Sequence, residues 1–380
     1  MTTIYLIRHA EAEGNRYRIW QGASEGKITD HGNRQLKALA ERFRSIPIDA
    51  LYSSHRDRAQ TTALALLDGH PDLVLKTDPR LQEINVGAWE QKAFANTAYY
   101  YPKQMEYFNH DPARFEVEGA ERFDEVRRRM EQALADIAQN HPGQTVAVAS
   151  HGMAIRTILA WYLQIPSNRI SELPHGDNTS VSKVLMDGNN VTVEYCNDDS
   201  HLGEELGTLK KQNWWKNRNG SDSSELRDEP LKFPRDSILY TRCYRNAWIA
   251  AHGSPSGFVS SPYLTSARDH MKKAPDSILK LYCGETFAGL LELDVERGQK
   301  IGAGWITLLY LEPEFRGRGM AIQLLGRAVL YFRDRGRDRI RLHVAEDNVK
   351  ALEFYRRNGF RIIGSKKGIR AELFLMEKDI

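Results

Sequence analysis

The sequence has few of the features that mark secreted, membrane or nucleic-acid-binding proteins. Its 380 residues include only 3 cysteines, which are too few and too widely spaced for a disulfide framework or a zinc site. No apolar run approaches the roughly 20 residues of a membrane helix, and the amino terminus lacks the pattern of a signal peptide. No Lys/Arg block with interleaved aromatic residues indicates a nucleic-acid surface. We therefore expect a cytoplasmic protein with neither membrane nor nucleic-acid partners.

The length and the pattern of the chain predict two α/β domains. A chain of this length exceeds what one hydrophobic core usually serves. In residues 1–202, short apolar strands alternate with longer amphipathic segments, as in α/β domains. Polar residues 203–236 predict a connector, which we expect to dock in part because it contains Trp214 and Trp215. A second α/β pattern follows in residues 237–380.

Two short apolar runs in the first domain each end on a histidine. Residues 4–7 lead to Arg8 and His9, and residues 146–149 lead through one serine to His151. Such runs are typical of strands that are buried on both faces, and ligands bind beyond the carboxyl ends of parallel strands. A neutral imidazole can attack phosphorus, while an arginine and a second imidazole hold the phosphoryl oxygens. The two runs therefore predict phosphoryl chemistry.

Other residues of the first domain fit the same chemistry. Arg58 follows a short strand and opens a helix, where its guanidinium and backbone N–H groups can face an anion. Glu83 lies in a loop, and burial beside Trp89 would raise its pKa enough for it to protonate a leaving alkoxide. Asn15 and the pair Gln21-Gly22 lie in the loop after the first strand, from which they can reach phosphate or substrate.

In these residues the first domain resembles the histidine phosphatase family. The family signature RHxE occurs at residues 8–11, and a YSSxxxRAxxTA block lies at residues 52–63. An LxExxxGxWE block follows at residues 81–90, and Ser150-His151-Gly152 completes the set. The resemblance covers nearly all of residues 1–202. It implies a three-layer, phosphoglycerate mutase-like fold with a mostly parallel sheet.

The resemblance also implies a role for each residue. His9 becomes phosphorylated, Glu83 supplies and then retrieves a proton, and Arg8, Arg58 and His151 form the phosphate pocket. No metal is required, because the cationic pocket neutralises the charge that develops.

The family contains phosphatases and mutases, and a domain without extra insertions resembles the phosphatases. We expect a small phosphomonoester substrate, contacted by Asn15, Gln21 and Gly22. The aromatic-rich segment 92–111 is expected either to form a lid over the substrate or to pack in the core.

In the second domain, an apolar strand at residues 306–311 leads into a glycine-rich turn and a helix. Glycines let backbone N–H groups approach a pyrophosphate, and the helix amino terminus adds partial positive charge. The turn matches the pattern [RQ]xxGx[GA] at residues 316–321, and residues 348–360 match NxxAxxxYxxxGF. Together the two motifs resemble the GNAT acetyltransferase family, over residues 237–379, which implies a mixed-sheet α/β fold.

The GNAT resemblance implies acetyl-CoA as donor and a small-molecule or peptide amine as acceptor. The strand at residues 306–311 would splay from its neighbour, and Tyr355 would protonate the departing thiolate. Glu312, Glu292 and His343 are candidates for the general base, with Glu312 preferred. The residues expected to bind the cofactor are Leu311, Arg316, Gly317, Arg318, Gly319, Met320, Ala321 and Asn348.

The whole sequence therefore predicts a bifunctional enzyme. One domain hydrolyses a phosphomonoester through a phosphohistidine, and the other transfers an acetyl group to an amine. Two alternatives stay open: a phosphoglycerate-type mutase, which returns the phosphoryl group to its product, and a phosphatase whose second domain senses CoA without transferring acetyl groups.

Overall fold

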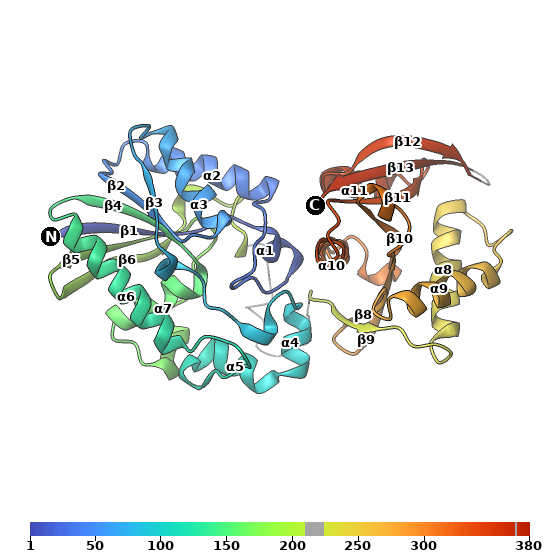
Figure 1. The fold of residues 1–380 in the computed structure, drawn as a ribbon, viewed down its shortest axis with the longest axis horizontal. Coiled ribbons are helices and arrows are strands. Elements are labelled where there is room, and N and C mark those ends of the chain that lie inside the picture. The colour runs from blue at the N-terminus through green and yellow to red at the C-terminus, as the bar shows by residue number, and fades with distance from the viewer. Residues whose placement is uncertain (210–223, 369–370) are drawn as a thin grey trace. The chain divides into compact units, whose positions relative to one another are not determined.

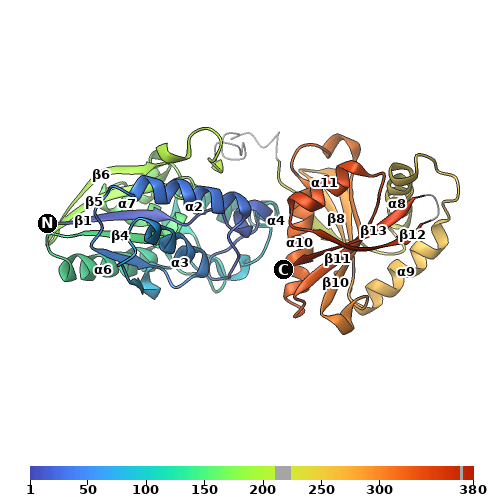
Figure 2. The same ribbon diagram turned by 90° about the horizontal axis from the view of Figure 1, so that it is seen from above.

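The chain forms two compact units, residues 1–218 and 219–380 (Figures 1 and 2). The computed structural model describes residues 1–209, 224–368 and 371–380. Trp214 and Trp215, whose docking we expected, lie outside these residues. In the described ranges, no helix has the length and apolar character needed to cross a membrane.

The first unit is built on one sheet with the strand order β3-β2-β4-β1-β5-β6. The strands from β3 to β1 in this order are parallel, and β5 and β6 form an antiparallel hairpin at the edge. The expected mostly parallel sheet is therefore confirmed. The strands are β1 (Thr2–Arg8), β2 (Ala50–Ser53), β3 (Leu75–Thr77), β4 (Thr145–Ser150), β5 (Val181–Asp187) and β6 (Asn190–Asp198). The helices are α1 (Glu13–Tyr17), α2 (Asp30–Phe43), α3 (Asp57–Leu64), α4 (Phe94–Tyr100), α5 (Pro102–His110), α6 (Phe123–Asn140) and α7 (Gly152–Tyr162).

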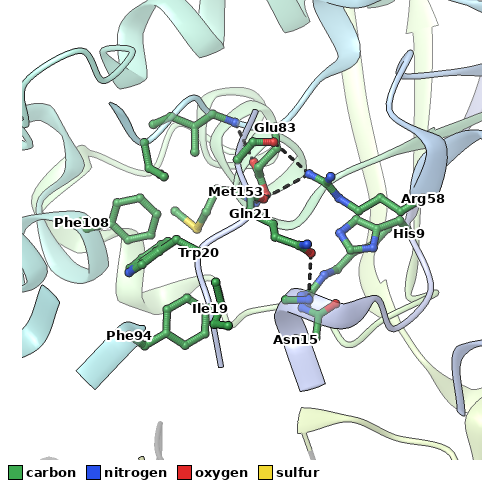
Figure 3. Close-up of a pocket in the computed structure, with 15 residues that line it drawn as sticks. His9, Asn15, Ile19, Trp20, Gln21, Arg58, Glu83, Phe94, Phe108 and Met153 are labelled. Carbon is green, nitrogen blue, oxygen red and sulfur yellow. Dashed lines mark hydrogen bonds between the residues drawn. The ribbon is translucent and has the colours of Figure 1, made fainter. Parts of the chain in front are cut away.

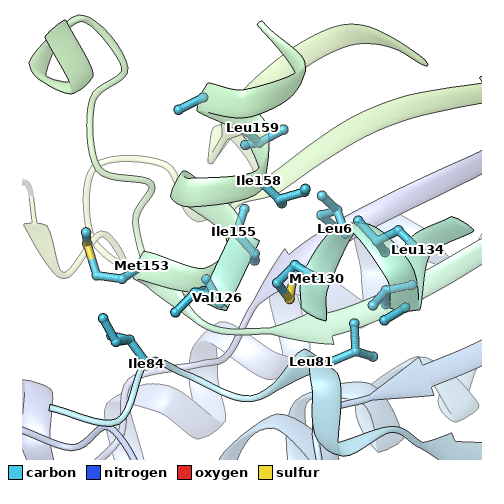
Figure 4. Close-up of a cluster of buried hydrophobic side chains, with 14 of the residues drawn as sticks. Leu6, Leu81, Ile84, Val126, Met130, Leu134, Met153, Ile155, Ile158 and Leu159 are labelled. Carbon is cyan, nitrogen blue, oxygen red and sulfur yellow. The ribbon is translucent and has the colours of Figure 1, made fainter. Parts of the chain in front are cut away.

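Helices cover both faces of this sheet. In β1, Ile4 and Leu6 pack into the core on the side of α6 and α7, part of which Figure 4 shows. Tyr5 and Ile7 point the other way, into the core beneath α2 and α3. Because successive strand side chains alternate between faces, two buried faces require a continuous apolar run. The three-layer arrangement thus explains the apolar runs in the sequence.

The register of the central strands brings the two histidines to one end of the sheet. β1 and β4 are adjacent and parallel, with Arg8 paired with Ser150. The next residue of each strand is a histidine, and the His9 backbone N–H donates to the Ser150 carbonyl at 2.9 Å. His9 and His151 therefore leave the sheet side by side.

The second unit has the strand order β12-β13-β11-β10-β9-β8-β7. Only β10 and β11 pair in parallel among the strand pairs described here, and the other pairs are antiparallel, so the sheet is mixed as expected. The strands are β7 (Arg227–Pro230), β8 (Ile278–Cys283), β9 (Thr286–Asp294), β10 (Ala303–Leu311), β11 (Arg339–Ala345), β12 (Arg361–Lys367) and β13 (Glu372–Asp379). The helices are α8 (Ser237–His252), α9 (Ser260–Lys273), α10 (Ala321–Arg333) and α11 (Val349–Arg357).

Part of the segment that we assigned to the connector belongs to the second sheet. Residues 227–230 form β7, which pairs with β8 at the edge. The backbone N–H of Leu226 donates to the Gln323 side chain at 2.8 Å, and Arg327 on α10 donates to Asp228. The sequence pattern failed here because the strand Arg-Asp-Glu-Pro is polar. Its side chains are stabilised by ion pairs instead of apolar burial.

The first residues of the expected connector pack on the first unit. The Asp177 carboxylate accepts the backbone N–H groups of Thr208 and Leu209 at 2.9 and 3.0 Å. His31 on α2 donates to the Leu206 carbonyl at 3.0 Å. Residues 206–209 therefore follow the surface of the first unit.

Candidate active sites

His9 lies just past β1 and lines a cavity of about 110 Å³ (Figure 3). Its Nδ1 donates to the carbonyl of Ala10 at 2.8 Å, and because a carbonyl can only accept, the lone pair is on Nε2. Burial lowers the pKa of His9 well below its ordinary value, and the charges of Arg58 and Arg8 lower it further. His9 is therefore a neutral imidazole with Nε2 available as a nucleophile.

His151 is the second imidazole of this site. Its ring centroid lies 5.2 Å from that of His9, with an angle of 60° between the rings. The side chain is fully buried, and neither ring nitrogen has a hydrogen-bond partner within the described ranges. Burial lowers its pKa well below the usual value, and the charge of Arg58 lowers it further. His151 therefore brings an uncharged, unsatisfied polar ring next to the nucleophile.

Two buried arginines complete the polar part of the site. Arg58 at the start of α3 is 1% exposed, and its terminal nitrogens donate to the carbonyls of Gln21, Gly22 and Ser24. Arg8 donates from Nη1 to the carbonyl of Gly176.

The Nε atoms of Arg8 and Arg58 have no partner in the part of the chain that is described. An unsatisfied buried donor costs about 1–3 kcal/mol. The concentration of such donors in one place, two of them positively charged, fits a ligand with several negatively charged oxygens.

A glycine leaves room for one of these cations. A Cβ atom at Gly152, the first residue of α7, would lie 3.2 Å from Nε of Arg8. The helix amino terminus and the guanidinium can therefore approach each other closely, which accounts for the glycine after His151.

Glu83 also lines the cavity, held at the amino terminus of α7. Its carboxylate accepts the backbone N–H groups of Met153 at 3.1 Å and Ala154 at 3.0 Å, in addition to that of Ile84. We expected the Glu83 carboxyl group to be buried beside Trp89. The hydrogen bonds that the carboxylate accepts come instead from backbone N–H groups. Trp89 packs against other aromatic rings, including Trp20 with a centroid distance of 5.1 Å.

Asn15 and Gln21 line the cavity, and both also stabilise the loop after β1. Asn15 Oδ1 accepts the backbone N–H of Ala12 at 3.0 Å. Gln21 Oε1 accepts the N–H of Gly14 at 2.9 Å, and Gln21 Nε2 donates to the Glu25 carbonyl. The structure thus brings these side chains to the site, with their oxygens already engaged.

Gly22 lies at a tight contact in the same loop. A Cβ atom there would lie 2.1 Å from the carbonyl oxygen of Ile84.

Sequence reasoning missed the residue that organises this loop, Glu90, whose carboxylate accepts the N–H groups of Gly22, Ala23 and Ser24. Since the carbonyls of this loop hold Arg58, Glu90 is a positioning residue. Its place at the end of the LxExxxGxWE block was the available signal.

The aromatic segment 92–111 contains α4 and α5, and its aromatic side chains have different surroundings. Phe94 and Phe108 line the cavity, and Phe108 is also part of the core. Tyr99, Tyr100 and Tyr101 are instead exposed. Trp20, which sequence reasoning did not select, joins the two phenylalanines in the cavity wall.

In the second unit, β10 and β11 separate as expected for a GNAT-like cofactor site. Their parallel pairing covers only residues 303–305 of β10 and 339–341 of β11. Beyond Trp305 the register of β10 with β9 also shifts, between Ile306 and Leu308. The remaining length of β10, up to Leu311, therefore has backbone groups available on the side of β11.

The glycine-rich turn follows directly. Gly317 and Gly319 both have φ of +73°, a conformation that glycine adopts without strain. A Cβ atom at either glycine would meet no atom within 4 Å, so the turn itself is open. The positive φ, and not a lack of space, is therefore what favours glycine at both positions.

The other expected cofactor residues lie around this turn. Arg316 donates from Nε to the carbonyl of Leu311 at 2.7 Å, while Arg318 is exposed. Met320 is buried, and Ala321 begins α10. Asn348 caps α11 by accepting the N–H of Ala351, a contact that the sequence analysis did not anticipate.

Tyr355 lies on α11 and is 8% exposed. Its ring packs against Phe354 and Phe360, with centroids 5.3 and 5.2 Å away. Burial raises its pKa, so the phenol keeps its proton at neutral pH. A phenol in this state suits proton donation to a thiolate.

The three candidate bases have different surroundings. Glu312 accepts hydrogen bonds from Arg242 and from the Tyr310 hydroxyl, both at 2.7 Å. His343 lies on β11 two residues past its last pair with β10, and its ring contacts Trp305 at a centroid distance of 5.0 Å. Burial and nearby cations lower the pKa of His343 to about 4, which leaves its imidazole neutral.

The third candidate, Glu292, is enclosed in a polar cluster. It is fully buried, and it accepts hydrogen bonds from the hydroxyls of Tyr240 and Tyr244 and from His270 Nδ1 at 2.8 Å. The other ring nitrogen of His270 lies 3.3 Å from Asp294. Burial alone would lower the pKa of His270, but hydrogen bonds and charge from Asp294 and Glu292 raise it to about 9. These contacts make Glu292 part of the packing between the sheet and α8 and α9.

The His270 cluster makes the second unit less stable in alkali. The pKa of His270 is about 9 in the folded protein and about 6.5 when unfolded. Its stabilisation is therefore complete below pH 6.5 and is lost as the pH rises through 9. We expect a loss of about 2–3 kcal/mol between these limits. The measurement is urea unfolding at several pH values, with proteolytic cleavage within β9 as the signal that the second unit has unfolded.

The matched variant is His270→Gln, which removes the titrating group. The free energy of unfolding of this variant should change little over the same pH range. The difference in free energy of unfolding between the natural protein and the variant should therefore shrink toward zero at high pH. An equal alkaline loss in both proteins would show that His270 is not the group responsible.

Comparisons with known proteins agree with this geometry. Residues 4–199 match the model of the histidine phosphatase superfamily (branch 1), and residues 240–360 match that of the acetyltransferase (GNAT) family. Within the residues described, no group of three or more His, Cys, Asp or Glu side chains is placed to hold a metal ion.

Relatives of the first unit include both phosphatases and mutases. Phosphoserine phosphatase 1 of Hydrogenobacter thermophilus is 29% identical over 204 residues, which are 54% of this chain and 96% of that protein. A probable phosphoglycerate mutase GpmB of Yersinia pestis is 30% identical over 209 residues, which are 53% of this chain and 95% of that protein. The solved structure of Bacillus stearothermophilus YhfR aligns with a TM-score of 0.51 and 30% identity, covering 53% of this chain and all of that one. The chain therefore belongs to the histidine phosphatase superfamily, and it carries a GNAT acetyltransferase domain in its second half.

Proposed function

We propose that the first domain hydrolyses phosphomonoesters through a phosphohistidine formed on His9. The observation that carries this proposal is the neutral, buried His9 beside His151, whose ring nitrogens lack partners, in a site with two arginines whose Nε atoms lack partners among the described residues. Such a site stabilises the charge on phosphoryl oxygens far better than water does, because its donors are already oriented.

In the first step, His9 Nε2 attacks phosphorus and the bond from phosphorus to the ester oxygen breaks. The leaving oxygen takes a proton from Glu83, so the alcohol departs neutral. Arg8, Arg58 and His151 hold the three remaining phosphoryl oxygens during the transfer. Glu83 Oε2 accepts one N–H bond, from Met153, and so retains a lone pair that can carry this proton.

In the second step, water attacks phosphorus on the phosphohistidine. Glu83, now ionised, takes a proton from the water while the nitrogen–phosphorus bond breaks. Inorganic phosphate leaves, and His9 returns to its neutral form. The low pKa of His9 favours this step, because the imidazole leaves without needing a second proton.

A phosphatase and a mutase of this family differ in where the phosphoryl group goes. We assign this chain to the phosphatases, which give it to water. Assaying free phosphate with a panel of phosphomonoesters, beside the interconversion of 3- and 2-phosphoglycerate, tests the assignment. Isomerisation of phosphoglycerate with little free phosphate would instead identify a mutase.

For the second domain we propose transfer of an acetyl group to an amine. The residues around the β10–β11 separation and the open turn at Gly317 and Gly319 fit acetyl-CoA, which would supply an activated thioester. Leu311, Arg316 and the turn at residues 317–321 would hold it. Tyr355 would hold the proton that the thiol needs on departure.

Replacing Tyr355 with phenylalanine should lower acetyl transfer by about 10²-fold, because general acid catalysis contributes roughly 10²–10⁴-fold. The measurement is thiol release from acetyl-CoA with a panel of amines comprising amino acids, a polyamine and a peptide with a free amino terminus. Acetyl-CoA binding, measured by calorimetry, should change little.

A matched control is Tyr331→Phe on α10, whose hydroxyl contacts Asp276 at the surface. It should transfer acetyl groups at the natural rate. If the natural protein binds acetyl-CoA tightly but transfers to no amine, and its phosphatase rate changes on binding, the second domain senses CoA. The acetyltransferase proposal would then be wrong.

A further inference from the structure

We infer that the phosphatase site selects phosphomonoesters of alcohols with an aromatic or bulky apolar group and discriminates against esters that carry a carboxylate. This inference rests on the proposed function of the first domain and names the class of its substrate. It follows from the division of the cavity into a polar end and an apolar wall.

The polar end of the cavity is the part that would bind the phosphoryl group of the substrate. Figure 3 shows His9, Arg58 and Glu83 near one another, with Asn15 and Gln21 beside them. The leaving alcohol must extend away from the phosphate, toward the remaining part of the lining. That part is apolar, and consists mainly of Ile19, Trp20, Ile84, Phe94, Phe108 and Met153.

The apolar wall is rigid as well as apolar. The Trp20 ring contacts Phe94 and Phe108 edge to face, with centroids 4.7 and 4.9 Å apart. Trp20 Nε1 also donates to the Thr97 hydroxyl at 2.8 Å, which fixes the orientation of the indole. A preformed wall of three rings gains free energy by burying apolar surface without first ordering its own side chains.

The cavity lining has no positively charged side chain left to pair with a carboxylate on the substrate. The positively charged side chains in its lining are Arg8 and Arg58, which the phosphoryl group requires. The remaining ionisable groups are His9, which is neutral, and Glu83, and neither offers a positive charge to a second anion. The polar amides do not replace a cation, since they carry no net charge and Gln21 Nε2 already donates to the Glu25 carbonyl. A carboxylate placed against the apolar wall would lose its hydration without gaining a partner.

The test compares alkyl esters, so that the leaving groups are similar in basicity. We expect kcat/KM for 2-phenylethyl phosphate to exceed that for ethyl phosphate by about 10–100-fold, the range expected from burial of a phenyl group. O-phosphoserine and 3-phosphoglycerate should be no better than ethyl phosphate. Phe94→Ala should reduce the ratio between phenylethyl and ethyl phosphate about 10-fold, while Phe94→Leu should restore part of it.

The control for Phe94 is Tyr99→Ala, an exposed residue of the same helix α4. It should leave the ratio between the two esters unchanged. A preference of the natural protein for O-phosphoserine or 3-phosphoglycerate would overturn the inference. So would an unchanged ratio in Phe94→Ala.

A binding measurement separates this inference from the proposed reaction. Calorimetry with 2-phenylethylphosphonate and 2-carboxyethylphosphonate needs no turnover, and we expect the phenyl compound to bind at least about 10-fold more tightly. That preference without hydrolysis of any ester would contradict the proposed function but support the inferred specificity. Hydrolysis with equal or reversed phosphonate affinities would support the reaction and overturn the specificity.

Discussion

Replacing His9 with alanine is expected to reduce the release of phosphate by at least about 10⁴-fold, because removal of a covalent nucleophile abolishes the pathway that it serves. The cavity offers no second nucleophile in an equivalent position. His151 is close to His9, but it is fully buried and, unlike His9, it is not among the residues that line the cavity. Steady-state phosphate release from an alkyl ester measures the effect.

The matched control is His70→Ala, which removes a histidine that contacts the Phe43 carbonyl away from the cavity. Its activity should stay within about twofold of the natural protein, since surface substitutions of this kind usually change stability only slightly. If His9→Ala folds normally and keeps a tenth or more of the activity, His9 is not the nucleophile.

Replacing Glu83 with glutamine should slow hydrolysis of alkyl esters by about 10²–10⁴-fold, the usual contribution of a general acid or base. The amide can still occupy the space at the amino terminus of α7, but it cannot give a proton to the leaving oxygen. An aryl ester such as p-nitrophenyl phosphate needs no such proton, so formation of the phosphoenzyme from it should slow much less. Burst kinetics with both esters separate the two steps.

Glu90→Gln provides the contrast. Glu90 orders the loop whose carbonyls hold Arg58, so its loss should raise KM for both classes of ester to a similar extent. A Glu83→Gln variant with the same behaviour, affecting both esters equally, would make Glu83 a positioning residue rather than a proton donor.

The parts of the fold that follow from periodicity were predictable. β1 and β4 are apolar at successive positions because both faces of the sheet are covered, and the two histidines follow those strands directly. The splay of β10 from β11 was likewise expected, from the resemblance to GNAT proteins. In each case, local sequence and neighbouring strands favour the same structure.

The parts that depend on contacts between distant segments were not predictable. β7 is polar and gains its stability from ion pairs, so no hydrophobic pattern marks it. The environment of Glu83 comes from the amino terminus of α7, about seventy residues away along the chain. Neither of these follows from residue type or spacing.

The candidate site shows the same division. Arg8, His9, Arg58 and His151 could be selected from their positions after strands or at helix starts. Trp20 could not, because it acts through aromatic packing. Glu90 was marked by its place in the LxExxxGxWE block, but residue type did not show that its carboxylate binds the backbone amides of another loop.

The most direct test of the phosphohistidine pathway is to trap the phosphorylated protein. Glu83→Gln enzyme mixed with p-nitrophenyl phosphate should accumulate the intermediate, because water then lacks its base. We expect an alkaline quench and peptide mass spectrometry to find the phosphoryl group on the peptide that contains His9, stable in alkali and lost in acid. A phosphoryl group on a hydroxyl or carboxyl side chain, or turnover at the full rate without any phosphorylated protein, would contradict the pathway.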